Sequence, residues 1–235
     1  MNFSGIQGFL FDLDDTLYPQ MEYTRQCVMG TIEYLSRVFG RPRSQIRASL
    51  MAVLEENGIE QRQLFNEALK RLGLELDDRH LKASLKLFWR VKPKIKLYPG
   101  AVEMFSSIRR KGFKLGMVTD GHVDVQKSKI RTLKIRKYFQ SIILSDEYGV
   151  EFRKPSTVPL MAALAELRLE PKSSVYVGND PRKDFVGSRS LGMRTIRIVQ
   201  GDYRNLSLEA EMEADVKVSN IRQLIDLIGG ENERQ

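Results

Sequence analysis

The stretch FLFDLDDT, residues 9–16, is an apolar run that stops abruptly at three carboxylates and a threonine. Short apolar runs of this kind predict a buried strand, here over residues 9–11. Asp12 and Asp14 stand two positions apart, so both side chains project from the same face of a chain that is still extended. Two carboxylates in one small space favour a shared proton or a bound divalent cation. The plainer alternative is a turn in which Asp15 and Thr16 cap a helix.

The rest of the chain alternates strand-like and helix-like segments. Short apolar or β-branched runs predict further strands over residues 114–118, 142–144, 175–177 and 195–199. Amphipathic stretches between them predict helices over residues 102–111, 123–133, 157–167 and 184–191. Strand alternating with helix predicts an α/β fold with a doubly wound parallel sheet. In such sheets, ligands bind beyond the carboxyl ends of the strands.

One long segment interrupts the alternation. From residue 21 to residue 88 only helical periodicity is found, with turn signals at Gly40-Arg41-Pro42, Asn57-Gly58 and Leu76-Asp77-Asp78. We therefore expect an α/β core made of residues 1–18 and 97–235. We expect residues 19–96 to form an inserted helical domain of four helices that covers the carboxyl end of the first strand as a lid. The tail, residues 229–235, is expected to be frayed.

Polar residues follow the other predicted strands as well. The motif VTDG supplies Thr119, Asp120 and Gly121, the motif EFRKPS supplies Lys154, and the motif VGNDPRKD supplies Asn179, Asp180 and Asp184. A hydroxyl and a lysine beside a metal-bound carboxylate provide the hydrogen-bond donors and positive charge that phosphoryl transfer requires. Each residue alone has a plainer explanation, as a helix cap, a surface lysine or part of a turn. Their arrival in order at strand ends favours a single site.

These motifs occur in the order and spacing of the haloacid dehalogenase superfamily of aspartate-nucleophile hydrolases, which the sequence resembles over nearly its whole length. Most members of that superfamily are phosphatases. The resemblance implies a Rossmann-like core with a helical cap. It implies that Asp12 is the nucleophile that becomes an aspartyl phosphate and that Asp14 is the general acid and base. Thr119 would hydrogen-bond the phosphoryl oxygens, and Lys154 would neutralise their charge. The implied substrate-binding residues are Thr119, Asp120, Gly121 and Lys154.

The resemblance also implies a magnesium ion, bridged by Asp12, the backbone carbonyl of Asp14 and an acid of the fourth motif. At the usual position of that acid this chain has Asn179. An amide oxygen still ligates magnesium, and neighbouring acids can replace or support it. The candidate metal residues are therefore Asp12, Asp14, Asn179, Asp180 and Asp184. The loss of one negative charge at Asn179 is expected to weaken magnesium affinity.

Other activities share part of this pattern. Carbon-halogen hydrolysis uses the nucleophile but, by the same resemblance, neither Asp14 nor a metal. A phosphomutase would use the same residues and differ in how the cap excludes water. A ligand-binding protein that lost turnover through Asn179 is a third alternative. The function that the sequence predicts best is hydrolysis of a small phosphate monoester, with the particular ester left open among sugar phosphates, nucleoside monophosphates, phosphoglycolate and similar compounds.

Composition and charge limit the remaining possibilities. The 235 residues are 42% hydrophobic, which suffices for a sizeable core, and no apolar stretch approaches the roughly 20 residues that span a bilayer. Cys27 is the only cysteine and the N-terminus lacks a secretory pattern, so we expect a cytoplasmic protein. The net charge of +8 suggests anionic partners. Because the basic residues at 109–114 and 127–137 alternate with apolar ones at helical spacing, we expect solvated helix faces. The expected partner is a small phosphorylated metabolite, not nucleic acid or a membrane.

Overall fold

The computed structural model describes residues 3–57 and 63–229. Gly58 of one expected turn and residues 230–235 of the expected frayed tail lie outside the described residues. The chain divides into two compact units, one formed by Met1–Pro19 with Lys96–Gln235 and the other by Gln20–Ile95. That these units are the separate domains expected from the sequence remains a prediction. None of the helices in the described ranges is long and apolar enough to cross a membrane.

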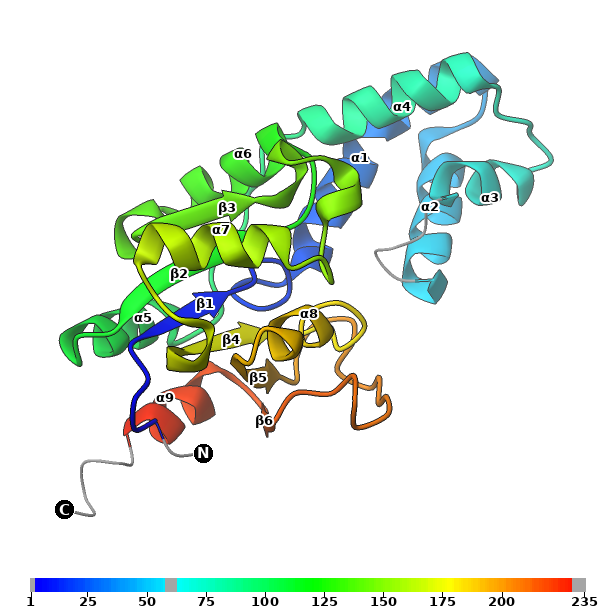
Figure 1. The fold of residues 1–235 in the computed structure, drawn as a ribbon. Coiled ribbons are helices and arrows are strands. Elements are labelled where there is room, and N and C mark those ends of the chain that lie inside the picture. The colour runs from blue at the N-terminus through cyan, green and yellow to red at the C-terminus, as the bar shows by residue number, and fades with distance from the viewer. Residues whose placement is uncertain (1–2, 58–62, 230–235) are drawn as a thin grey trace. The chain divides into compact units, whose positions relative to one another are not determined.

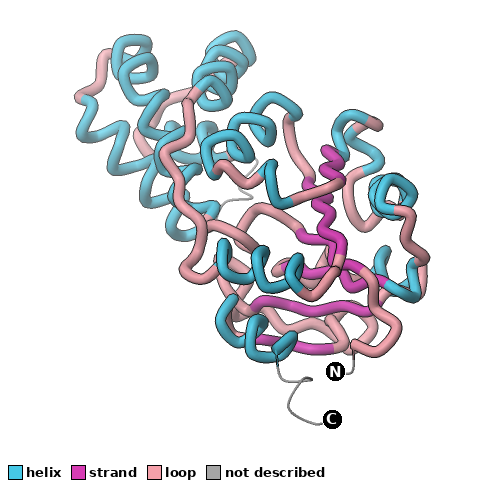
Figure 2. Tube along the Cα trace, turned by 90° about the vertical axis from the view of Figure 1, so that its left-hand side faces the viewer, coloured by secondary structure: helices cyan, strands magenta, loops and turns pink. Residues whose placement is uncertain are grey.

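In the described part of the first unit, six strands form one parallel sheet in the order β3-β2-β1-β4-β5-β6 (Figures 1 and 2). The strands are β1 (Gly8–Phe11), β2 (Lys114–Thr119), β3 (Ser141–Leu144), β4 (Ser174–Gly178), β5 (Arg194–Ile198) and β6 (Val216–Val218). β1 lies between β2 and β4, although more than 100 residues separate it from β2 in sequence. The polar residues that follow these three strands therefore meet at one edge of the sheet.

Helices cover both faces of the sheet. They are α5 (Ala101–Arg110), α6 (Val123–Leu133), α7 (Val158–Leu167), α8 (Val186–Ser190) and α9 (Ile221–Gly229). Single 3₁₀ turns span Arg136–Tyr138, Ser145–Glu147, Val150–Phe152 and Pro171–Ser173. In Figure 1, α7 crosses in front of β2 and β3, against which it packs, while α5 packs against β2 and α9. The expected doubly wound α/β sheet is confirmed.

The alternation of side chains along β1 places one core on each face of the sheet. Leu10 belongs to a buried cluster with residues of α7, including Leu160 and Leu164. On the opposite face, the Phe11 ring packs edge-on against Phe105 of α5, with ring centroids 6.1 Å apart. Because both faces are covered, β1 is apolar throughout its length and reads as a continuous run, which is typical of a parallel sheet.

Two elements near the C-terminus were not predicted. β6 has only three residues, and a charged lysine stands at its centre, so Val216–Val218 shows no apolar run. It is recognisable as a strand only through its pairing with β5, where Ile196 lies opposite Val216. α9 follows it directly and buries Ile221, Leu224 and Ile228. The predicted helix over residues 184–191 is shorter in the structure, because α8 begins only at Val186.

The second unit is entirely helical in its described part, as the periodicity of residues 21–88 predicts. Its helices are α1 (Gln20–Phe39), α2 (Arg43–Asn57), α3 (Leu64–Lys70) and α4 (Asp78–Arg90). α1 contributes Val28, Ile32 and Leu35 to the core of this unit, at the spacing of one helical face. α4 begins after Asp77, whose side chain accepts a hydrogen bond from the backbone N–H of His80 at 2.7 Å. The second unit thus has a hydrophobic core of its own.

Candidate active site

Three neighbouring strands deliver the expected site residues to one edge of the sheet. Asp12 follows β1, Thr119 is the last residue of β2, and Asn179 follows β4. Lys154 lies in the loop before α7. All four residues are at most 5% exposed. Buried polar residues need hydrogen-bond or ion-pair partners, and each of these four side chains has at least one.

The ammonium group of Lys154 lies between two buried carboxylates. Its Nζ is 2.5 Å from Asp12 Oδ1 and 2.7 Å from Asp184 Oδ1. The same nitrogen donates to the hydroxyl of Tyr176 at 2.9 Å. Lys154 is therefore held by three groups within reach of the proposed nucleophile, where an added phosphoryl group would also meet its positive charge.

Burial dominates the protonation of Asp12. It raises the pKa of this carboxyl group to about 7, although the Lys154 ammonium works in the opposite direction, and the carboxylate of Asp184 adds to the increase. For Lys154, burial opposes the charge, but Asp12 and Asp184 together hold the pKa well above its usual value. The site thus keeps a permanent positive charge beside a carboxyl group that titrates near neutral pH.

Asp14 has a different set of partners. Its Oδ1 accepts from Lys129 Nζ at 2.7 Å and from the hydroxyl of Tyr18, and its Oδ2 accepts from Gln126 Nε2 at 2.9 Å. Burial tends to raise the pKa of Asp14, but the charge of Lys129 and the hydrogen bonds from Lys129, Tyr18 and Gln126 hold it below its usual value. Gln126 Nε2 also lies 2.6 Å from Thr119 Oγ1, so one side chain links both motifs.

The expectation that the basic residues at 127–137 form a solvated helix face is wrong for Lys129. Lys129 is not part of a solvated helix face: it is 3% exposed and forms an ion pair with Asp14. Sequence reasoning missed both Lys129 and Gln126. The available signal was their spacing of three positions, which places them on the same face of α6 as the buried Val125 and Ile130.

The alternative in which Asp15 and Thr16 serve as helix caps is also resolved. Thr16 is fully buried, and its hydroxyl lies 3.1 Å from Asp12 Oδ2 and 3.2 Å from Asn179 Oδ1. Asp15 has a φ of 55°, and its carboxylate accepts from the backbone N–H of Asp202 at 3.2 Å. Gly201 lies so close to Asp15 that any Cβ there would overlap its carboxylate. Thr16 therefore belongs to the site, while Asp15 ties a distant loop to it.

The contacts of Asn179 fit a bound cation. Asn179 is 2% exposed, and its Nδ2 is a buried atom with no hydrogen-bond partner among the described residues. The Thr16 hydroxyl has a single hydrogen, and when it donates to Asp12 it can only accept from the Asn179 amide. A 180° rotation of the amide would present its NH₂ to Thr16 and bring its oxygen, which lies 3.2 Å from the Thr16 hydroxyl, to the unpartnered position. An amide oxygen there would be the kind of ligand that magnesium takes.

The other two metal candidates of the fourth motif are already engaged. Arg182 holds the Asp180 carboxylate with two bonds of 2.9 and 2.8 Å, which keep its pKa below the usual value against the effect of burial. Asp184 Oδ2 accepts the backbone N–H groups of Asn179 and Asp180 at 3.0 and 2.9 Å. Among the described residues, no three His, Cys, Asp or Glu side chains cluster as a metal site.

The loop after β2 is tied to the neighbouring loops. The Asp120 carboxylate accepts from the backbone N–H of Lys154 at 3.2 Å. Gly121 adopts a φ of 126°, and its N–H donates to Asp146 at 3.4 Å. Asp120 thus fixes the backbone that carries Lys154. Gly121 provides a conformation that residues with a Cβ rarely adopt.

A buried arginine supports the loop that carries Asn179, and sequence reasoning did not find it. Arg197 of β5 is 1% exposed and donates to the Asn179 carbonyl at 3.2 Å. It also pairs with Glu213 at 2.6 Å and donates to the Tyr203 carbonyl at 2.6 Å. In sequence it looks like an ordinary basic residue near the end of a strand, because its partners lie in segments that are distant along the chain.

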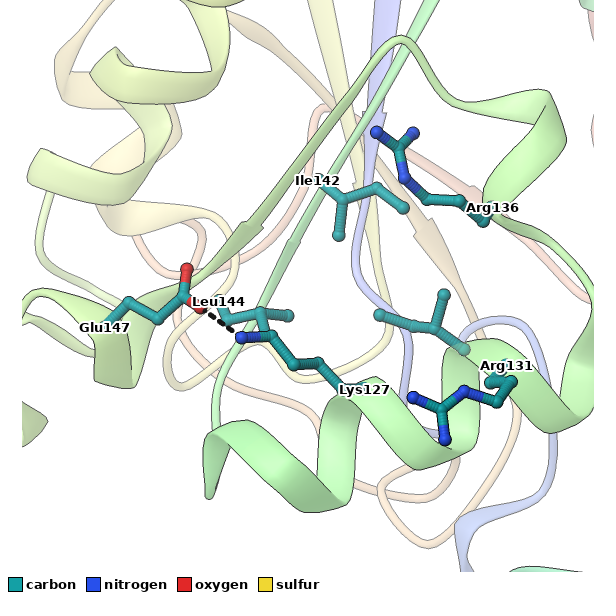
Figure 3. Close-up of a pocket in the computed structure, with 7 residues that line it drawn as sticks. Lys127, Arg131, Arg136, Ile142, Leu144 and Glu147 are labelled. Carbon is teal, nitrogen blue, oxygen red and sulfur yellow. Dashed lines mark ion pairs between the residues drawn. The ribbon is translucent and has the colours of Figure 1, made fainter.

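A cavity of about 370 Å³ lies elsewhere on the first unit, in the groove between α6 and β3 (Figure 3). Its walls include Ile142 and Leu144, with Arg131 and Arg136 at its side and an ion pair between Lys127 and Glu147 at 2.8 Å. None of the proposed catalytic side chains lines it. This cavity is therefore distinct from the candidate active site at the strand ends.

Comparison with known proteins agrees with this geometry. A family model described as haloacid dehalogenase-like hydrolase matches residues 9–198. The glyceraldehyde 3-phosphate phosphatase of Methanopyrus kandleri is 29% identical to the chain over 228 residues, covering 95% of this chain and 97% of that protein. The phosphoserine phosphatase of Thermus thermophilus is 24% identical, covering 92% and 96%. The crystal structure of a HAD phosphatase from Thermococcus onnurineus superimposes with a TM-score of 0.66 at 25% identity, covering 96% and 99%.

The chain belongs to the haloacid dehalogenase-like hydrolase family, since the family model spans most of its length. The resemblance noted in the sequence is confirmed, and so is the expected class of enzyme, a phosphoric monoester hydrolase of this family.

Proposed function

We propose that the protein is a magnesium-dependent phosphatase that hydrolyses a small phosphate monoester through an aspartyl phosphate on Asp12. The observation that carries this proposal is the contact between Asp12 and Lys154, whose Oδ1 and Nζ atoms lie 2.5 Å apart in a buried site. A carboxylate nucleophile beside a fixed ammonium group suits attack on an anionic phosphorus centre, because the ammonium offsets the repulsion between the two anions.

The reaction would proceed in two transfers. In the first, Asp12 Oδ forms a bond to phosphorus while the bond from phosphorus to the leaving oxygen breaks, and Asp14 gives a proton to the departing alcohol. In the second, Asp14 takes a proton from water, the water oxygen bonds to phosphorus, and the Asp12 carboxylate is released. Asp14 is a carboxylate in the free enzyme, so it has to gain a proton when the phosphate group binds. The negative charge of the phosphate group favours this uptake.

Magnesium would be held by the carboxylate of Asp12, the backbone carbonyl of Asp14 and the amide oxygen of Asn179. When bound there, it would supply positive charge that stabilises the phosphoryl oxygens. Thr119 and Lys154 would also contact the phosphoryl oxygens. Asp180 and Asp184 would not contact the metal directly; they would stabilise the loop that carries Asn179.

The proposed substrate is a small phosphorylated metabolite. The relatives from Methanopyrus kandleri and Thermus thermophilus are named for glyceraldehyde 3-phosphate and phosphoserine, and both compounds are phosphate monoesters of three-carbon molecules. We propose that residues 19–96 form a cap that selects among such esters, and that the enzyme acts in the cytoplasm without a nucleic-acid or membrane partner. The positive net charge of the chain suits an anionic substrate.

Phosphate release from 4-nitrophenyl phosphate, glyceraldehyde 3-phosphate, phosphoserine and phosphoglycolate, with and without magnesium, tests the proposal. We expect magnesium-dependent turnover by the wild type and none by Asp12→Asn. An acid-quenched reaction should show, by intact mass, one phosphoryl group on the wild-type chain and none on the variant. Turnover that persists in Asp12→Asn would overturn the role of Asp12. Magnesium binding without turnover on any ester would favour the ligand-binding alternative.

A further inference from the structure

Two buried side chains of α6 contact the proposed acid–base residue. Gln126 and Lys129 are three positions apart and lie on the same face of the helix, and they are 1% and 3% exposed. Neither belongs to the four motifs that identify the family in the sequence. Lys127 and Arg131 of α6 are exposed and line the groove shown in Figure 3, together with the buried Ile130. The helix thus directs one lysine into the site and another to its exposed side, where Lys127 pairs with Glu147.

Gln126 and Lys129 together hold both oxygens of the Asp14 carboxylate. Lys129 Nζ lies 2.7 Å from Oδ1, and Gln126 Nε2 lies 2.9 Å from Oδ2. The Tyr18 hydroxyl also donates to Oδ1, and because the two oxygens have different donors, the carboxylate cannot rotate without breaking a charge-assisted hydrogen bond. The second bond of Gln126, to Thr119 Oγ1 at 2.6 Å, fixes the same carboxylate relative to the end of β2.

We infer that Gln126 and Lys129 are positioning residues, which hold the Asp14 carboxylate in the orientation from which it exchanges protons with the leaving alcohol and with water. This inference rests on the proposed function, because it takes Asp14 to be the acid and base. Gln126 in addition sets the spacing between Asp14 and the hydroxyl of Thr119. A shift of about 1 Å in a reacting group can cost about 100-fold in rate, so fixing this carboxylate has a large kinetic effect.

A role in packing alone does not account for Lys129. Burying an ammonium group requires loss of hydration, and ordering a lysine side chain costs about 2 kcal/mol of rotamer entropy. An apolar residue at this position of α6 would join Val125 and Ile130 in the core without either cost. What the lysine adds is a fixed contact with Asp14, supported by the Tyr18 ring 5.8 Å from its Nζ.

The test compares Lys129→Met with the matched control Lys127→Met, which removes an exposed lysine two positions away. Phenyl phosphate and 4-nitrophenyl phosphate serve as substrates, because 4-nitrophenol departs as a stable anion and needs no proton from Asp14. For Lys129→Met we expect kcat on phenyl phosphate to fall about 10- to 100-fold with KM nearly unchanged. On 4-nitrophenyl phosphate we expect a burst of one nitrophenolate per enzyme, since only the water step is slowed. Lys127→Met should match the wild type, and Lys129→Arg should recover part of the rate.

A double-mutant cycle separates positioning from general destabilisation. If Lys129 acts through Asp14, Lys129→Met should cause no further loss in an Asp14→Asn background. Gln126→Leu, which removes no charge, should show the same pattern and keeps the test valid if Lys129→Met unfolds in a thermal melt. Equal losses on both substrates without a burst, or losses that multiply with Asp14→Asn, would overturn the inference alone. Absence of wild-type turnover on both esters would overturn the proposed function and this inference with it.

Discussion

Replacing Asn179 with aspartate is the sharpest perturbation of the proposed metal site. The two side chains have nearly the same shape, so the substitution changes charge while leaving the packing around β4 in place. Without metal, the new carboxylate lies near Asp12 in a buried site. With magnesium bound, it becomes a charged ligand where the wild type has a neutral one. We therefore expect Asn179→Asp to destabilise the metal-free protein and to tighten magnesium binding.

The expected loss of stability and the expected gain in magnesium affinity can both be estimated from the distance between the side chains of residues 12 and 179. The Thr16 hydroxyl is 3.1 Å from Asp12 Oδ2 and 3.2 Å from the Asn179 side-chain atom that faces it, so in Asn179→Asp an oxygen of the new carboxylate lies at most about 6 Å from Asp12 Oδ2. Two unit charges at that distance repel by about 3 kcal/mol at an effective dielectric constant of about 20. Proton uptake by either carboxylate and the ammonium of Lys154 offset part of this repulsion, so we expect a net destabilisation on the order of 3 kcal/mol. Relief of the same repulsion would tighten magnesium binding on the order of 100-fold.

Urea unfolding at pH 8, with chelator and with magnesium, measures the first effect, and calorimetric titration with magnesium measures the second. Asn205→Asp is the matched control, because Asn205 is exposed and its replacement adds the same negative charge at the surface. We expect Asn179→Asp to be less stable than the control in chelator and to gain more stability from magnesium. The magnesium concentration for half-maximal turnover should fall as well. Wild-type magnesium affinity combined with wild-type metal-free stability in Asn179→Asp would refute the placement of this side chain beside the metal.

Two further predictions concern the buried charges around the site. Arg197→Met should lower the free energy of unfolding by about 3 kcal/mol, because it leaves the Glu213 carboxylate with Lys217 as its only ion-pair partner among the described residues and removes the support of the Asn179 carbonyl. Adding Glu213→Gln should restore part of the loss, and a urea-unfolding difference below about 1 kcal/mol for Arg197→Met would contradict this prediction. The second prediction concerns Asp12, because burial raises the pKa of its carboxyl group from 3.8 to about 7. Between these two pH values the native metal-free protein keeps the proton on Asp12, whereas the unfolded chain has released it. Metal-free wild type should therefore lose about 4 kcal/mol of stability as pH rises from about 4 to about 7, a loss that Asp12→Asn should lack. Parallel pH profiles of the two proteins in urea unfolding would be inconsistent with the raised pKa.

Much of the fold is predictable because it depends on local patterns. The apolar run at residues 9–11 and the similar runs at residues 114–118 and 175–177 correspond to β1, β2 and β4 within a residue or two. α6 begins and ends where its amphipathic pattern does, at residues 123 and 133. The elements that escaped prediction, β6 and α9, follow a segment without such a pattern, and β6 exists only through its pairing with β5.

The residues of the candidate site also fall into a group that local sequence patterns predict and a group that they do not. Asp12, Asp14 and Thr119 could be proposed from the sequence because each follows or ends a predicted strand, and parallel strands bring such ends together. Lys154 could be proposed because it precedes a predicted helix within a recognisable motif. Thr16, Gln126, Lys129 and Arg197 could not, because their partners are set by which strands are neighbours in the sheet. Lys129 illustrates this: 115 positions separate it from Asp14.

The sequence by itself thus determined the α/β class, the helical insertion and the order of the catalytic motifs, since hydrophobic periodicity and residue type are local properties of the chain. Only the tertiary structure decided which polar side chains are buried together, which of two nearby lysines on α6 reaches Asp14, and how the Asn179 amide meets Thr16. The physical reason is that desolvation, ion pairing and hydrogen-bond satisfaction depend on distances between segments that are far apart in sequence.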